Sequence, residues 1–69
     1  MTPELLRKVG RALYGRVYKR ALSEDLGINE RTVRRWLKGE FNMPPDVSDK
    51  CRKLVIARIA TLWNLRKEL

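Results

Sequence analysis

Residues 20–39 read RALSEDLGINERTVRRWLKG, and this stretch decides the fold. Apolar residues recur at helical spacing on both sides of Gly27, which predicts two short helices joined by a tight turn. Glycine adopts positive φ without a Cβ clash, so Gly27 can end the first helix and redirect the chain. Asn29 is a favourable N-cap, since its side chain can accept a hydrogen bond from a free backbone N–H. We expect helices at about 19–26 and 30–38.

Each of these two predicted helices has one apolar face. Leu22 and Leu26 lie one turn apart in the first helix. In the second helix, Val33, Trp36 and Leu37 share a face at spacings of i, i+3 and i+4. Side chains at these spacings line one side of a helix, so the two helices are expected to pack against each other.

The opposite face of the second helix is strongly basic. At about 100° per residue, its four cations fall within roughly one 100° arc. They are Arg31, Arg34, Arg35 and Lys38. Neighbouring like charges cost a few tenths of a kcal/mol per pair, and a DNA backbone would remove that cost and add counterion release. The competing interpretation is an αα-hairpin within a bundle whose basic face is merely solvated.

Two helices, a glycine turn and a basic second helix resemble the helix-turn-helix of phage-repressor-like regulators, the Cro-type or lambda-repressor-like domains. Small Ser23 stands where that family has Ala or Gly, Gly27 stands at the turn, and Val33 and Trp36 stand at buried positions. The run TVRRWLKGE, followed by MP, is similar to many small bacterial and phage repressors. About half of the chain carries the resemblance. It implies sequence-specific binding of double-stranded DNA by a small transcriptional regulator, with the second helix in the major groove.

The resemblance also implies which side chains meet DNA. The implied base contacts are Glu30, Arg31, Arg34 and Arg35. The implied phosphate contacts are Arg20, Asn29, Thr32 and Lys38. Three roles stay open. Glu30 either holds Arg34 in place through an i, i+4 ion pair or accepts a hydrogen bond from a cytosine amino group. Arg34 either contacts bases or has only a bracing role within the helix. Arg20 either binds the backbone or is simply solvated.

Composition limits the remaining possibilities. The chain has 69 residues, enough for one domain over 1–69, and 16 Lys or Arg against 8 Asp or Glu, a net charge of +8. Such a charge favours polyanionic partners. With no histidine and one cysteine, Cys51, neither a disulfide nor a metal set is expected, and no cofactor. Adjacent Glu24 and Asp25 point about 100° apart, and no glycine-rich phosphate loop exists, so we do not expect an enzyme.

The N-terminal segment predicts a helix at 3–14, with Thr2 as cap and Pro3 at its first position. Tyr18 and Val17 are expected to cover the core, although the Tyr18 hydroxyl can alternatively contact a phosphate. In the loop 40–45, Phe41 and Met43 are expected to pack underneath.

The last helix is predicted over 45–67, which completes an all-α fold of four helices with a long C-terminal one. Its apolar residues form two arcs about 100° apart. The core arc is Val47, Cys51, Leu54, Val55, Leu62 and Leu65. The second arc is Ile56, Ile59 and Trp63. We interpret the second arc as a homodimer seam. The alternative is one broad buried stripe in which Trp63 covers the first helix.

Other functions stay open at this stage. The last helix can instead bind a different protein, as in an antitoxin-like or adaptor module, or the chain can be a non-specific architectural DNA binder. An RNA binder fits less well, because single-stranded RNA readers display stacking aromatics. No stretch approaches the ~20 apolar residues of a membrane span, and no signal peptide or effector pocket is evident. We expect a cytoplasmic, nucleoid-associated protein.

Overall fold

Four helices and no strands make up the computed structural model, which describes residues 1–69. The helices are α1 (Pro3–Tyr14), α2 (Lys19–Leu26), α3 (Glu30–Lys38) and α4 (Asp46–Glu68). The all-α prediction is confirmed, and the bounds of the first three helices agree with those expected. The fourth begins and ends one residue later than expected. None of the four combines the length and apolar character that crossing a lipid bilayer requires.

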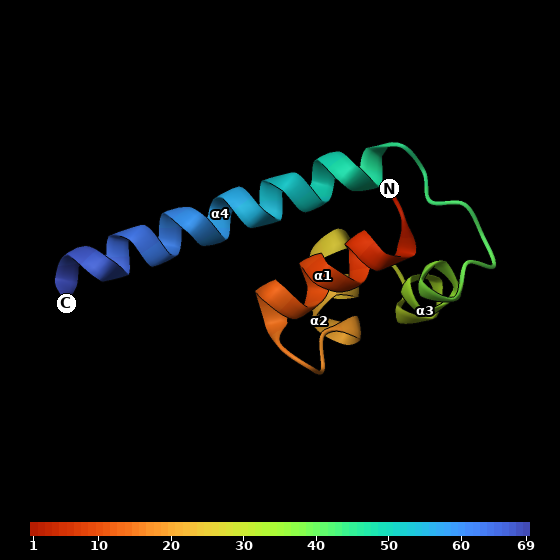
Figure 1. Cartoon of the computed structure of the whole chain (residues 1–69), viewed down its shortest axis with the longest axis horizontal. Coiled ribbons are helices and arrows are strands. Elements are labelled where there is room, and N and C mark those ends of the chain that lie inside the picture. Colours follow the sequence, from red (N-terminus) through yellow and green to blue (C-terminus); the bar gives the residue numbers. More distant parts are fainter.

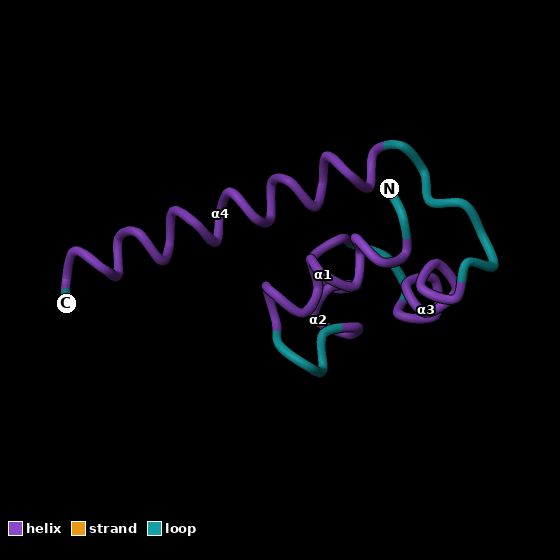
Figure 2. The backbone as a smooth tube through the Cα atoms, viewed as in Figure 1, coloured by secondary structure: helices purple, strands orange, loops and turns teal.

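Helices α1, α2 and α3 form a cluster, and α4 runs along one side of it (Figure 1). The C-terminal end of α4 extends beyond the cluster, while the long loop from α3 leads back to its first turn (Figure 2). The molecule is therefore elongated, with principal extents of 44 × 23 × 20 Å. A buried core joins all four helices. Its apolar members are Leu6, Leu13, Tyr18, Leu22, Leu26, Val33, Trp36, Leu37, Val47 and Cys51.

The turn between α2 and α3 has the geometry that the sequence predicts. Gly27 adopts the left-handed conformation, with φ 70° and ψ 31°. Its N–H donates to the carbonyl of Glu24 at 3.1 Å, and the N–H of Ile28 donates to the carbonyl of Ser23 at 3.0 Å. These two bonds satisfy the last carbonyls of α2 in a Schellman arrangement. The turn therefore fixes the direction in which α3 leaves.

The α1–α2 connection is held by a close approach of Tyr18 to Gly10. Tyr18 is buried, as expected, and its ring lies directly against the backbone of Gly10. A Cβ atom at position 10 would fall 2.7 Å from Tyr18 Cε2 and 2.8 Å from Cγ, well inside van der Waals contact. Glycine inside a helix costs about 1 kcal/mol relative to alanine. Here that cost is offset because only glycine leaves room for the ring.

Two expectations about loop residues were wrong. Val17 does not cover the core but is 88% exposed, because its neighbour Tyr18 takes the inward position. Phe41 is exposed instead of packing under the loop, and its ring carries the guanidinium of Arg35 at 5.4 Å. Met43 does pack against the core, as expected.

The core arc predicted for α4 is only half right. Val47 and Cys51 are buried and Leu54 packs against the core, but Leu62 and Leu65 are exposed. The helical spacing is correct, but the C-terminal part of α4 extends beyond the other three helices (Figure 1). No neighbouring helix therefore covers these two residues. The second arc is exposed as well. Ile56, Ile59 and Trp63 show 55–59% of their surface, so a broad buried stripe over the first helix is not what the structure contains.

Arg58 fixes α4 where it leaves the cluster. Its Nη1 donates to the carbonyl of Leu13 at 2.7 Å, and its guanidinium lies over the Tyr14 ring at 5.9 Å. The Tyr14 hydroxyl in turn donates to the carboxylate of Asp25. Burial, followed by this hydrogen bond, raises the pKa of Tyr14 above its ordinary value, so the hydroxyl stays protonated as a donor. One arginine therefore ties α4 to the end of α1, which is itself tied to α2.

The contact between Gly10 and Tyr18 predicts a reversal in a double-mutant cycle. Gly10→Ala should lower the free energy of unfolding by about 1–3 kcal/mol through overpacking, despite the better helix propensity of alanine. In a Tyr18→Leu background, where the ring is absent, the same substitution should be neutral or stabilising. Chemical denaturation of the four proteins measures both effects. Equal effects in the two backgrounds would show that the ring does not set the requirement for glycine.

Candidate nucleic-acid interface

The rotation of α3 about its own axis is fixed by three buried side chains. Val33 is fully buried, and Trp36 and Leu37 are buried beside it. Because side chains about 100° apart point in different directions, burying this face turns the opposite one to solvent. All four cations predicted on that face are exposed. They are Arg31, Arg34, Arg35 and Lys38.

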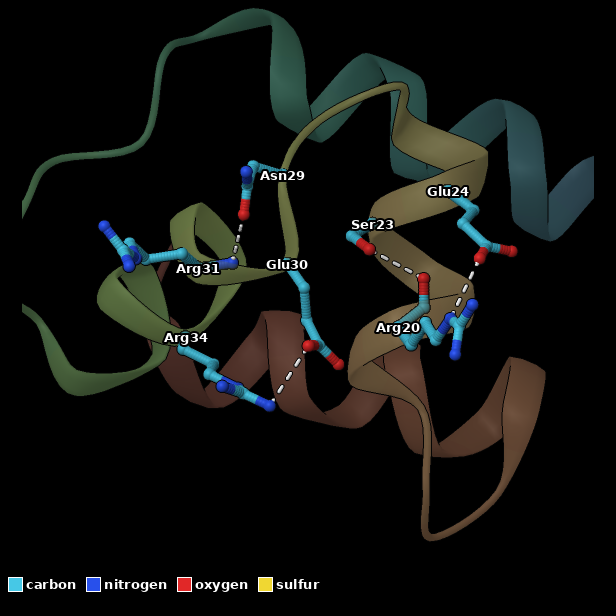
Figure 3. Close-up of polar contacts among 7 residues, drawn as sticks. All are labelled: Arg20, Ser23, Glu24, Asn29, Glu30, Arg31 and Arg34. Carbon is cyan, nitrogen blue, oxygen red and sulfur yellow. Dashed lines mark hydrogen bonds and ion pairs between the residues drawn. The ribbon is translucent and has the colours of Figure 1, made fainter.

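Arg31 occupies the middle of the exposed face. Its side chain extends away from the other helices (Figure 3), and it forms no side-chain hydrogen bond or ion pair within the protein. Its backbone N–H donates to Oδ1 of Asn29 at 2.8 Å, so the predicted N-cap is confirmed. The cap uses only the side-chain oxygen of Asn29. Its NH₂ group is left to donate to an external acceptor.

Glu30 and Arg34 form the i, i+4 pair that the sequence suggests. Arg34 Nη2 lies 3.0 Å from Glu30 Oε2, and Arg34 stays more than half exposed (Figure 3). In the free protein Glu30 therefore braces Arg34. Exposed pairs of this kind contribute about 0.3–0.5 kcal/mol, so the pair can open at little cost when a stronger partner arrives.

Arg35 lies at the edge of the basic face, and its side chain contacts the α3–α4 loop. The ring of Phe41 beneath its guanidinium orients this side chain, an interaction worth about 0.5–1 kcal/mol at an exposed site. No pattern in the sequence indicates this contact, because the sequence predicts that Phe41 is buried under the loop. The loop thus contributes to the arrangement of the basic face.

The residues predicted to contact phosphates come from α2, from the turn before α3 and from α3 itself. Arg20, in the first turn of α2, is exposed and pairs with Glu24 at 3.2 Å. Lys38 is exposed at the end of α3, whereas Thr32 is half-buried on its flank. Ser23 is buried in α2, and its hydroxyl donates to the carbonyl of Arg20 at 2.6 Å.

Basic residues outside the predicted set extend this surface onto α1, the α1–α2 connection and the first residue of α2. They are Arg7, Arg11, Arg16 and Lys19, and together with Arg34 and Lys38 they line one hollow. The i, i+4 spacing of Arg7 and Arg11 is a signal present in the sequence. Their position beside α3 depends on how α1 packs, which the spacing does not reveal.

Metal-binding and nucleophilic side chains are the other groups that could carry chemistry. No group of three or more His, Cys, Asp and Glu side chains gathers where it would hold a metal ion. Cys51 is buried, and burial raises the pKa of its thiol, which disfavours the reactive thiolate.

Comparison of this chain with protein-family models, with curated proteins and with solved structures found no match in any of the three.

The N-cap of α3 generates a stability prediction. Asn29→Ala should lower the free energy of unfolding by about 1 kcal/mol, because the N–H of Arg31 loses its partner. Asn29→Asp should retain stability, since a carboxylate also caps and favours the positive end of the helix. Asn42→Ala, in the exposed loop, is the matched control. Thermal denaturation followed by circular dichroism ranks the variants, and an Asn29→Ala protein as stable as the control would refute the capping role.

Proposed function

We propose that this protein binds double-stranded DNA sequence-specifically and acts as a small bacterial or phage transcriptional regulator. In this proposal α2 and α3 are a repressor-like helix-turn-helix, and α3 is the recognition helix. One observation carries the proposal. The inner face of α3 is anchored in the core, so the face that carries its four cations points outward.

The dimensions of α3 suit the major groove. An α-helix with side chains is about 10–12 Å across, and the groove is about 12 Å wide. Four cations confined to one side of a short helix would contact phosphates or base edges together once the helix entered the groove. Each phosphate that they neutralise releases counterions, which favours binding most at low salt.

Within the groove, the N-terminal half of α3 would meet the base edges. Arg31 has no competing partner in the protein, and its guanidinium suits the O6 and N7 atoms of guanine. Arg35 is held in place by Phe41 and would contact a neighbouring base. Arg34 would either contact a base or remain braced by Glu30, whose second carboxylate oxygen is available to a cytosine amino group.

The phosphate contacts would fix the register of the protein on DNA without contributing sequence preference. Lys38 and the amide group of Asn29 are available without rearrangement. Arg20 would exchange Glu24 for a phosphate, and Thr32 would contribute from the flank. The exchange at Arg20 is inexpensive, because exposed ion pairs contribute about 1 kcal/mol or less.

We further propose that two copies associate through the projecting part of α4. The seam consists of Ile56, Ile59 and Trp63, and Leu62 adjoins it. Arg58 is the sole charged residue between Leu54 and Leu65, and it turns toward Leu13 on the core side. Exposed apolar surface of this extent on a small protein is typical of an interaction site.

A second copy is the occupant that fits this surface most simply. A two-fold dimer needs a patch that complements itself, and an antiparallel pairing of two α4 helices sets apolar side chains against apolar side chains. Such a dimer would present two α3 helices to two half-sites spaced by about one turn of DNA. As a DNA-bound regulator, the protein would work at the nucleoid in the cytoplasm.

The base-contact assignment is tested on a duplex selected from a random pool. On that duplex, Arg31→Gln should weaken binding by about 1–3 kcal/mol and relax the preference at one base pair. Lys38→Gln should weaken binding to all sequences alike and lower the salt slope by about 1. Lys53→Gln, on the exposed face of α4, removes the same charge and is the control. Fluorescence anisotropy at about 150 mM salt, with RNA as competitor, measures these effects.

Three outcomes would contradict the proposal. If Arg31→Gln left the base preference unchanged, the base contact would be wrongly assigned. Binding with no sequence preference would point to an architectural protein. Tighter binding to RNA than to duplex DNA would refute the proposal as a whole.

The seam is tested by sedimentation equilibrium of the full chain at micromolar concentration. Wild type should sediment as a dimer, and Ile59→Glu as a monomer, since a buried carboxylate without a partner is costly. Ala57→Glu adds the same charge on the opposite side of α4 and should remain dimeric. A monomeric wild type would contradict the seam, and capture of one stoichiometric partner would then favour an adaptor module.

A further inference from the structure

A strongly basic hollow of about 310 Å³ lies between α1, the α1–α2 connection and the C-terminal half of α3. Eight residues line it, and six of them are cationic. The cations are Arg7 and Arg11 from α1, Arg16 and Lys19 from the connection and the start of α2, and Arg34 and Lys38 from α3. Tyr18 and Leu37 complete the lining, and no acidic residue belongs to it.

These cations are left without acidic partners, whereas other cations of the chain are neutralised. Of the six, Arg34 alone forms an ion pair, with Glu30. The remaining ion pairs of the molecule lie on α2 and on the first turns of α4, where Lys50 pairs with Asp46 at 3.3 Å and Arg52 with Asp49 at 2.8 Å. The hollow therefore concentrates unbalanced positive charge that an external anion would stabilise.

The arrangement of the lining cations suits a phosphate group. Guanidinium groups from two sides of a hollow can each bind phosphate oxygens through two parallel N–H donors. The buried ring of Tyr18 and the buried side chain of Leu37 give the hollow an apolar wall. Charges beside low-dielectric protein attract each other more strongly than charges in bulk water. Arg7 is already oriented there, since its Nη2 lies 3.5 Å from the carbonyl oxygen of Leu37.

We propose that this hollow is a phosphate-binding site, separate from the base-contacting Arg31 and Arg35. Its occupant is the phosphodiester backbone of the strand beside the groove that α3 enters, so this inference rests on the proposed function. A second hollow of about 240 Å³ adjoins it, with Lys19, Arg20 and Arg34 among its lining cations and Glu30 as its one acidic residue. Arg34 lines both hollows and lies on the outward face of α3. The two hollows are therefore continuous with the basic face of the proposed recognition helix.

The matched pair Arg11→Gln and Lys8→Gln tests the site. Both residues are exposed on α1, and each substitution removes one charge, but Arg11 lines the hollow and Lys8 does not. Binding to the selected duplex and to a random duplex is measured over a range of salt concentrations. Arg11→Gln should weaken binding to both duplexes by the same factor and reduce the salt slope by about 1, with base preference intact. Lys8→Gln should behave like wild type, and thermal denaturation confirms that both variants fold.

A second arm separates backbone phosphate from free polyphosphate. Inorganic pyrophosphate is added to the ¹⁵N-labelled free protein, and the amides of residues 16–19 are followed by NMR. Shifts that saturate in wild type and vanish in Arg11→Gln support a phosphate site. If those shifts occur but Arg11→Gln and Lys8→Gln bind DNA equally well, the occupant is a free polyphosphate, and the DNA backbone is excluded as the occupant. If Arg11→Gln matches Lys8→Gln on DNA and pyrophosphate causes no shifts, the site is refuted. Base discrimination through Arg31 would stand in that case, so the two proposals fail separately.

Discussion

The packing of α3 into the core through Val33 is the constraint on which the rest of this structure depends. Val33 is fully buried, so α3 cannot rotate without exposing it and its buried neighbours Trp36 and Leu37. The Schellman turn at Gly27 and the cap at Asn29 set where α3 begins, and Val33 sets which side faces outward. The packing of the core therefore determines that the basic face of α3 points to solvent.

Charge in this protein is distributed unevenly, and the unevenness follows the fold. Asp46 and Asp49 neutralise cations within the first turns of α4. Around α3 and the adjoining side of α1, one carboxylate, that of Glu30, pairs with one of the cations. An excess of this kind on one side of an 8.1 kDa protein raises the association rate with polyanions and makes binding depend on salt. Residues 59–65 of the projecting part of α4, by contrast, include no charged side chain and expose Ile59, Leu62, Trp63 and Leu65.

Local features of this fold could be predicted from the sequence, and long-range ones could not. Helix bounds, the turn at Gly27 and the cap at Asn29 follow from chemistry within a few residues. Helical spacing placed Leu62 on the same face as the core residues of α4, but spacing carries no information about where the neighbouring helices end. The approach of Tyr18 to Gly10 and the bond from Arg58 to the end of α1 join distant segments, so no local pattern reveals them.

The central claim is that the outward face of α3 meets DNA, and an NMR titration tests it most directly. Duplex DNA selected from a random pool is added to the ¹⁵N-labelled protein at about 150 mM salt, and amide shifts are mapped onto the helices. The account predicts the largest changes at residues 29–38 of the α3 region and at 19–20 in α2, with the C-terminal part of α4 unaffected. Changes confined to α4, or none at saturating DNA, would contradict it.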